Sequence, residues 1–282
     1  MPKVSDPLLR RIVPRLAEVR GLVGVVLGGS RARGTATATS DYDIGLYYGS
    51  AVPLDTAHLL DVVRELVDDP NSADVTSVGA WGPRIVGGGW LSIDGRKVDL
   101  LYRGVEPVRT VIAACRAGQI SMTYQPGLPH GFCSAIWMGE VAICQPLYDP
   151  QGFIAELQGE TTPYPSELQA ALLRMFQWEI LFSIENGEIA IARNERTHIA
   201  GCIYRALCCI GQVLFAFNQR YLINEKAALN EAAYFPHTIS SLTERVDRLW
   251  AAFGRSDFRS ALTDLRMLDA DLRLLVSSKI RD

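Results

Sequence analysis

Hydrophobic and polar positions follow two different patterns along the chain, and the change comes near its middle. In the first half, residues 22–27 form a short β-branched run that ends at Gly28-Gly29, and residues 41–48 alternate between polar and apolar positions. A short apolar run predicts a buried strand, and strict alternation predicts a strand with one buried face. After about residue 150 the apolar positions recur every three or four residues, which is typical of helices.

The same patterns place the other elements of the first half. Residues 8–20 are expected to form an opening helix, and Asp55 is a suitable N-cap for a helix that continues to about Val67. Residues 85–93 and 97–102 flank Asp94-Gly95, a dipeptide typical of a tight hairpin turn. These two segments are therefore expected to pair as strands. No element is assigned to residues 118–143.

The second half predicts a helical bundle. Residues 158–165 contain two prolines and are interpreted as a linker, and Ser166 with Gln169 has the spacing of a capping box. Three stripes of apolar residues follow at helical spacing, which predicts four or five helices. A further aromatic set is expected in the bundle core: Trp178, Phe182, Phe215 and Phe217. The stripes are Leu168, Leu172, Phe176, Ile180 and Ile184; Leu207, Leu214 and Phe215; and Phe258, Leu262, Leu265, Leu268, Leu272 and Leu275.

The expected fold class is therefore α+β. An α/β domain with a small mixed sheet is predicted over residues 1–150, and a helical bundle domain over residues 151–282. The composition agrees with this, because 48% hydrophobic and 21% charged residues are ordinary for a globular protein.

Charge and cysteine content narrow the expected partners and location. A net charge of −3 argues against a long nucleic-acid footprint, which needs a basic surface. The six cysteines include no Cys-x-x-Cys pair, so free thiols in a reducing compartment are expected. The first residues, Met-Pro-Lys-Val-Ser-Asp, are too polar for a signal peptide, and no apolar run is taken to reach the length of a membrane span. A cytoplasmic protein with no membrane partner is expected.

Candidate chemistry is concentrated on three aspartates. Asp41 and Asp43 are two residues apart on a predicted strand, so both carboxylates project from one face. Such neighbouring anions repel each other unless cations lie between them, and two metal ions about 3.5–4 Å apart are the usual device for in-line phosphoryl chemistry. Asp99, on the polar side of the second hairpin strand, can supply a third carboxylate. An all-oxygen donor set favours magnesium or manganese over zinc.

A candidate phosphate-binding loop lies upstream, where Gly28, Gly29 and Ser30 directly follow a strand. Glycines let backbone amides approach a phosphate, and Ser30 adds a hydroxyl donor. The guanidinium groups of Arg31 and Arg33 could meet phosphate oxygens, although exposed surface charge is an equally good interpretation of both. Together the loop and the carboxylates predict nucleotide transfer, in which a hydroxyl attacks the α-phosphorus of a metal-bound triphosphate and pyrophosphate leaves.

At these residues the sequence resembles the polymerase β-type nucleotidyltransferase superfamily, in which Gly-Ser is followed, after a loop, by Asp-x-Asp with apolar neighbours. Here Gly29-Ser30 is followed by ten residues, 31–40, and then by Asp41-Tyr42-Asp43-Ile44. The hairpin at residues 94–100 resembles the family's third-carboxylate strand, so the resemblance covers roughly the first 105 residues. A transferase domain followed by helices is similar to antibiotic nucleotidyltransferases, which attach AMP to a hydroxyl of aminoglycosides or lincosamides.

The resemblance implies roles for the three aspartates and for their ligands. Asp41 and Asp43 would bind metal together with the triphosphate, and Asp99 would complete the catalytic metal site. Asp99 or a nearby glutamate would accept the proton of the attacking hydroxyl, with Glu140 and Glu179 as further candidates. The implied cofactor is Mg²⁺, the implied co-substrate is ATP or another nucleoside triphosphate, and the implied acceptor is a small molecule, with antibiotics among the candidates.

Three alternatives stay open. The acceptor could be a protein hydroxyl, as in toxin-neutralising nucleotidyltransferases, or the chain could be a non-catalytic nucleotide-binding module. Arg193 and His198 have an Arg-x4-His spacing that resembles the ribonuclease motif of HEPN-type helical domains, in which such a pair could perform general acid–base catalysis. A homodimer is also open, since the apolar stripe of residues 258–275 could pack across a two-fold axis.

Overall fold

The computed structural model describes residues 6–279 and divides into two compact units. The first unit comprises Met1–Cys115 and Ser121–Pro163, and the second comprises Arg116–Ile120 and Tyr164–Asp282. The predicted domain boundary lies at residue 150, whereas the main change from the first unit to the second comes after Pro163.

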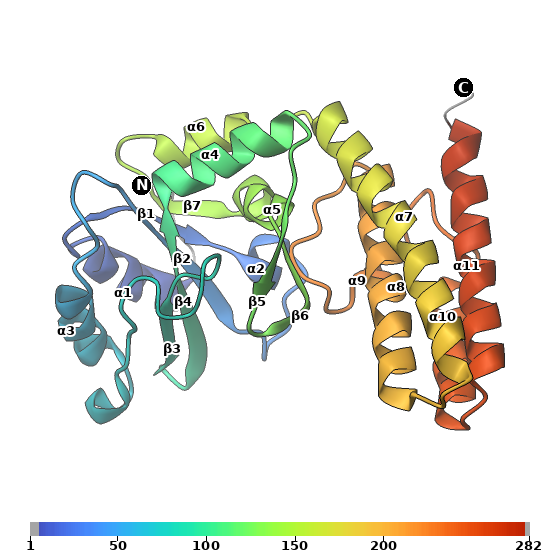
Figure 1. Ribbon diagram of the computed structural model, residues 1–282. Coiled ribbons are helices and arrows are strands. Elements are labelled where there is room, and N and C mark those ends of the chain that lie inside the picture. The colour runs from blue at the N-terminus through green and yellow to red at the C-terminus, as the bar shows by residue number, and fades with distance from the viewer. Residues whose placement is uncertain (1–5, 280–282) are drawn as a thin grey trace. The chain divides into compact units, whose positions relative to one another are not determined.

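The first unit contains a five-stranded mixed sheet in the order β3-β4-β2-β1-β7 (Figure 1). β2 and β4 are parallel, and the other neighbouring pairs are antiparallel. A separate hairpin of β5 and β6 occupies part of the segment to which the sequence analysis assigns no element. The elements are α1 (Pro7–Leu16), β1 (Leu22–Leu27), α2 (Gly29–Ala32), β2 (Tyr42–Tyr48), α3 (Thr56–Leu66), η1 (Pro70–Ser72), β3 (Gly88–Ile93), β4 (Arg96–Gly104), α4 (Val105–Arg116), β5 (Met122–Gln125), β6 (Leu128–Cys133), α5 (Ala135–Ile143), β7 (Gln145–Tyr148) and α6 (Phe153–Gly159).

One face of this sheet carries a hydrophobic core that joins strands to helices of the first unit. The predicted alternation in β2 holds as far as Leu46, because Tyr42, Ile44 and Leu46 are buried together with their partners in β4. It then breaks, because Tyr47 is buried and Tyr48 is only half-buried. The helices α1 and α3 cover this face and supply the other half of the core. The other face of β2 and β4 carries Asp43 and Asp99 near the start of the strands, and further along it carries the buried residues Tyr47 and Arg103.

Local hydrogen bonds explain where these elements begin and turn. Asp6 caps α1 through the amide of Leu8, at 2.9 Å. Asp55 caps α3 as predicted, through the amide of His58 at 3.0 Å. In the β3–β4 hairpin, Asp94 and Gly95 both adopt positive φ, at 53° and 67°. This is the geometry that the dipeptide predicts.

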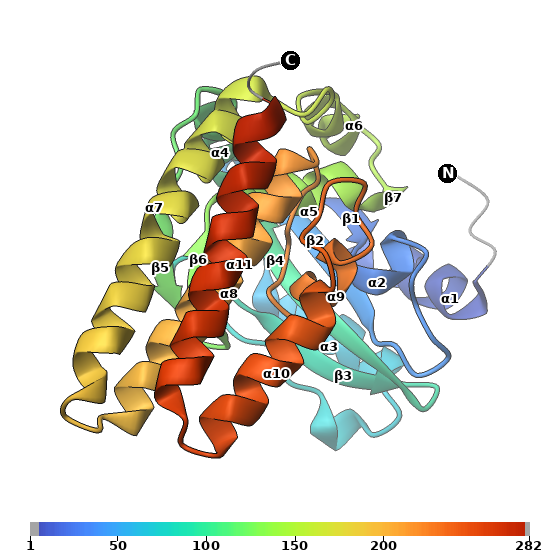
Figure 2. The ribbon, with the colours of Figure 1, turned by 90° about the vertical axis from the view of Figure 1, so that its right-hand side faces the viewer.

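The second unit is a helical bundle, as predicted (Figure 2). α7 packs against α8 and α11, and α10 packs against α11. The predicted apolar stripes are buried, except that Leu275 is only half-buried. The helices are α7 (Ser166–Ile191), α8 (Arg196–Phe217), α9 (Ala228–Ala232), α10 (Leu242–Gly254) and α11 (Phe258–Lys279).

Two predictions about α7 are wrong. Ser166 is the first helical residue rather than the cap, which is Pro165, so no capping box forms. The side chain of Gln169 donates instead to the carbonyl of Ala216, at 2.8 Å. Trp178 and Phe182 are 64% and 50% exposed and stack on each other. Helical spacing alone cannot say which face of α7 the neighbouring helices cover.

The expectations about membranes and thiols have different outcomes. By length and composition alone, α8 is apolar enough to cross a membrane, which corrects the expectation that no run reaches such a length. However, 72% of its most apolar stretch is buried inside the protein, as in the core helix of a bundle. The six cysteines, all of them within the described residues, form no disulfide, as predicted. The signal-peptide expectation depends on residues 1–5, which lie outside the described residues.

Candidate active site

Asp43 and Asp99 lie directly opposite each other in the sheet. In the parallel pair of β2 and β4, Asp43 is the register partner of Asp99, between the pairs Tyr42–Val98 and Ile44–Leu100. Because side chains alternate along both strands, the two carboxylates project from the same face, away from the core. Asp41 directly precedes β2 and is two residues from Asp43, so the same alternation brings a third carboxylate to this face.

The loop after β1 packs tightly against Asp43. The amide of Gly28 donates to the carbonyl of Asp43 at 2.7 Å, which continues the ladder beyond the end of β1. Gly29 has a φ of +58°, and a side-chain carbon at this position would lie only 1.8 Å from Oδ2 of Asp43. Only glycine fits both the conformation and the space. The structure therefore brings the predicted phosphate loop, Gly28 to Ser30, beside the predicted metal ligand.

Arg31 connects this loop to the start of β2. Its Nε donates to the carbonyl of Asp41 at 3.1 Å, and its Nη2 donates to the carbonyl of Ser40 at 2.6 Å. Its guanidinium also lies 3.7 Å from the centre of the Tyr42 ring. These contacts make Arg31 a positioning residue for Asp41. Arg33 is exposed at the end of α2. Phosphate binding by Arg31 and Arg33 stays a prediction.

Tyr42, between the two aspartates, anchors them from the opposite face of the strand. Its ring is buried, its hydroxyl donates to Asp6 at 2.8 Å, and Arg96 donates to the same hydroxyl at 2.6 Å. Burial raises the pKa of Tyr42, and the neighbouring Asp6 carboxylate raises it further. No role was predicted for Asp6, Tyr42 or Arg96 from the sequence. The sequence signal for this anchor is an aromatic residue that alternates with two carboxylates on a predicted strand.

Glu140 is engaged in an ion pair within the first unit. Its two carboxylate oxygens accept from Nε and Nη2 of Arg103, at 2.8 and 2.9 Å, and the Arg103 side chain is only 3% exposed. Burial acts against the charge of Arg103, but the Glu140 carboxylate outweighs it, so the pKa of Arg103 is raised. This geometry favours a structural role for Glu140 over that of a catalytic base.

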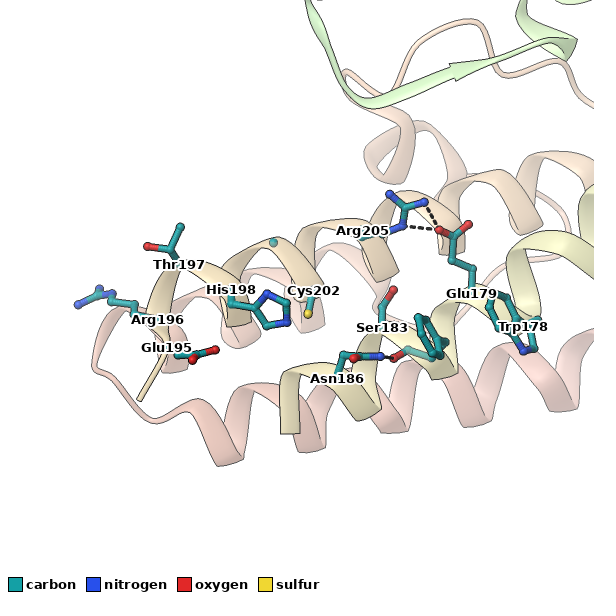
Figure 3. A pocket seen from close by; sticks show the side chains of 12 residues that line it. Trp178, Glu179, Ser183, Asn186, Glu195, Arg196, Thr197, His198, Cys202 and Arg205 are labelled. Carbon is teal, nitrogen blue, oxygen red and sulfur yellow. Dashed lines mark hydrogen bonds and ion pairs between the residues drawn. The ribbon is translucent and has the colours of Figure 1, made fainter. Parts of the chain in front are cut away.

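The helical unit carries a separate groove between α7 and α8, with a volume of about 1100 Å³ (Figure 3). Trp178, Phe182 and Asn186 line it from α7, and His198 and Arg205 line it from α8. Glu179 forms an ion pair with Arg205 in this groove.

The same groove bears on the Arg-x4-His alternative. His198 is among the residues that line the groove, whereas Arg193, in the turn before α8, is not. The residues described around this groove therefore do not support a joint catalytic role for Arg193 and His198.

Comparison with known proteins gives a result for the N-terminal part of the chain. Residues 9–73 match the family model of the nucleotidyltransferase domain. The matched segment contains Gly28, Gly29, Ser30, Asp41 and Asp43, and it ends before Asp99. The match supports nucleotidyl transfer as the general activity, and domains of this family generally use divalent metals.

Among solved structures, the chain is similar to a nucleotidyltransferase-like protein from Exiguobacterium sibiricum 255-15. The two are 11% identical, the alignment covers 97% of this chain and 74% of the other, and the TM-score is 0.43. No curated protein matches the chain.

Proposed function

We propose that the chain is a Mg²⁺-dependent nucleotidyltransferase that moves a nucleoside monophosphate, AMP from ATP, to a hydroxyl of a small acceptor. The observation that carries the proposal is the register pair of Asp43 and Asp99, with the Gly29 backbone packed against the Asp43 carboxylate. A carboxylate pair next to a glycine loop is the combination that nucleotide transfer needs.

The residues at this site fit a divalent cation. Asp41, Asp43 and Asp99 offer carboxylate oxygens alone, which suit Mg²⁺ rather than a softer metal. These three residues would hold the ion, which when bound neutralises the triphosphate and polarises the reacting phosphorus.

The triphosphate would lie along the loop that follows β1. The amides of Gly29 and Ser30, at the start of α2, would meet the phosphate oxygens, because the amide of Gly28 already donates to the carbonyl of Asp43. Ser30 would add its hydroxyl. Arg31 would act indirectly, because its guanidinium holds the backbone of residues 40 and 41.

In the reaction, the acceptor oxygen forms a bond to the α-phosphorus, and the bond from this phosphorus to the oxygen that bridges to the β-phosphorus breaks. Pyrophosphate leaves with the electron pair of that bond. The proton of the attacking hydroxyl passes to the Asp99 carboxylate in our proposal. Asp99 is preferred over Glu140, because both oxygens of Glu140 already accept from Arg103.

The proposed acceptor is a small molecule, and the resemblance to antibiotic nucleotidyltransferases makes an aminoglycoside or lincosamide hydroxyl the first to test. A protein hydroxyl is the alternative acceptor. Transfer to a small molecule and transfer to a protein would use the same nucleotide-binding residues. The first experiment therefore tests nucleotide binding alone.

That experiment is isothermal calorimetry with non-hydrolysable analogues of ATP and GTP, with and without Mg²⁺. Metal-dependent binding of ATP that disappears in Asp43→Asn is the expected result. Equal binding by the wild type and Asp43→Asn would contradict the site. No metal-dependent binding of either nucleotide would contradict the proposed function.

A further inference from the structure

Two tryptophans stack beside the candidate site. Trp90 of β3 is the antiparallel register partner of Asp99, so the two side chains lie on the same face of the sheet. Trp81, from the loop before β3, stacks on Trp90 with ring centres 4.4 Å apart and planes inclined by 19°. Trp90 is nevertheless 70% exposed. A stacked tryptophan pair, in which Trp90 is exposed and Trp81 half-buried, thus adjoins a carboxylate of the candidate site.

The strand order fixes which side of the site the tryptophans occupy. Across the sheet, the glycine loop after β1 is followed by Asp43 on β2, Asp99 on β4 and Trp90 on β3. The triphosphate loop and Trp90 are therefore on opposite sides of the carboxylate pair. In an in-line displacement the entering hydroxyl lies opposite the departing pyrophosphate. The acceptor thus approaches from the side of Asp99 and Trp90.

The loop that carries Trp81 is held in place by a buried amide. The side chain of Gln125, which is 2% exposed, donates to the carbonyl of Trp81 at 2.7 Å. Its oxygen accepts from the amides of Arg84 and Ile85, at 3.3 and 3.1 Å. Gly88 completes the arrangement, because a side-chain carbon there would lie 3.0 Å from the Trp81 ring. The pair is thus ordered by the protein itself, and binding does not have to order it.

We propose that the Trp81–Trp90 pair is a stacking platform for a ring of the acceptor. The acceptor is then a small cyclic molecule with one flat, apolar face and a hydroxyl at its edge. Stacking on Trp90 directs that edge towards Asp99, the neighbouring residue on β4. This inference rests on the proposed function and specifies its acceptor, and it disfavours a hydroxyl on an extended peptide.

The test uses the full chain with Mg²⁺ and ATP labelled at the α-phosphate. One pool of acceptors contains ring compounds, with saturated members (methyl pyranosides, amino sugars and cyclitols) assayed apart from phenolic ones. The other pool contains open-chain polyols and serine peptides. We expect label in the ring pool alone, and the labelled subset distinguishes a saturated from an aromatic ring.

The best-labelled compound then serves to compare variants. Trp90→Ala is expected to raise its KM about tenfold, with kcat within about threefold of the wild type, because a stacking contact of ordinary strength is lost. Trp90→Phe should restore most of the loss. Trp178→Ala is the matched control, since Trp178 is also exposed and stacked, on Phe182 in the helical unit, and its KM should equal that of the wild type.

Calorimetry with Mg²⁺ and the ATP analogue separates this inference from the proposed function. If the wild type binds ATP but labels only open-chain acceptors, or no acceptor, the ring platform is wrong. The platform is also wrong if Trp90→Ala leaves the KM of a ring acceptor unchanged, or if it weakens ATP binding by the same factor. If the wild type itself showed no metal-dependent binding of the ATP analogue, the proposed function would be wrong instead.

Discussion

Gly29 and Asp43 are packed so closely that a methyl group on Gly29 would lie 1.8 Å from the Asp43 carboxylate oxygen Oδ2. No non-bonded atoms approach so closely, so the loop and the carboxylate cannot both keep their positions once residue 29 has a side chain. The position of the proposed metal ligand therefore depends on the smallest residue of the neighbouring loop.

Gly29→Ala should consequently displace Asp43 and reduce kcat/KM by at least about 100-fold, since small displacements of reacting groups are costly. Gly34→Ala is the matched control, because Gly34 also has a positive φ, of +72°, but nothing lies within 4 Å of its added carbon. Both variants carry a backbone cost of about 1–2 kcal/mol in unfolding free energy. Steady-state kinetics that showed equal activity in the two variants would contradict the proposed contact.

Asp43→Asn and Asp99→Asn keep the size of each side chain and remove its charge. Each should reduce transfer at least about 1000-fold, because several kcal/mol of charge stabilisation is lost with the metal site. Release of pyrophosphate measures the loss. Asp61→Asn, on the exposed side of α3 in an ion pair with Arg64, should retain full activity. Activity retained in Asp99→Asn would exclude that carboxylate as ligand and as proton acceptor.

Much of the first unit could be predicted from the sequence, because the signals there are local. The run at residues 22–27 is β1 to the residue, and Asp94-Gly95 forms the hairpin turn. By contrast, the β5–β6 hairpin escaped prediction. The residues around its Pro126-Gly127 turn show neither the length nor the alternation that identifies longer strands.

The candidate site was only partly predictable, for a different reason. Local spacing brings Asp41 and Asp43 together, but the register of Asp99 on Asp43 and of Trp90 on Asp99 depends on pairing between distant segments. The partners of Arg31 are the main-chain carbonyls of residues 40 and 41, and the partner of Glu140 is the buried Arg103, and charge alone reveals neither. The residue types of the candidate site are thus visible in the sequence, whereas their neighbours follow only from the pairing of the strands.

Breaking the Arg103–Glu140 pair should affect stability rather than chemistry. Glu140→Gln leaves the buried guanidinium of Arg103 without its counter-charge and should lower the free energy of unfolding by about 3 kcal/mol. Glu156→Gln removes an exposed pair with Arg109 and should cost less than about 1 kcal/mol. Urea denaturation measures both. If folded Glu140→Gln lost transfer activity without losing stability, Glu140 would be the base after all.

Acid should weaken the anchor of the Asp-Tyr-Asp strand through Asp6. Burial raises the pKa of Asp6, but hydrogen bonds from Tyr42 and from the amides of Leu8 and Leu9 outweigh it, so the pKa lies below 3.8. A carboxyl group with a lowered pKa in the folded state stabilises the fold above pH 3.8 and loses this contribution as the pH falls through the folded-state value.

Asp6→Ala should therefore be less stable than the wild type by about 1 kcal/mol at neutral pH, as expected for a lost helix cap. The difference should shrink below pH 3.8 in urea denaturation at a series of pH values. Asp6→Asn keeps a cap acceptor without a charge, so its loss of unfolding free energy relative to the wild type should be smaller than that of Asp6→Ala. A difference that stays constant from pH 7 to about pH 2 would contradict the role of the charge.

The ribonuclease alternative predicts that substitution of His198, and not of Asp43, abolishes the activity of the protein. We expect His198→Ala to transfer nucleotide as well as the wild type, because His198 lies in the groove of the helical unit. Labelled single-stranded RNA should stay intact with both proteins. RNA cleavage that survived Asp43→Asn and disappeared in His198→Ala would favour the Arg-x4-His interpretation.

The position of β7 has a consequence for synthesis on the ribosome. β1 lies between β2 and β7, and β7 is the last strand of the first unit to be translated. Until residues 145–148 emerge, the outer backbone edge of β1 has no partner strand, although all three aspartates have already been made. A nascent chain with such an open edge is prone to pair with its neighbours on the same message. The sheet of the nascent first unit is therefore complete only once β7 has left the ribosome.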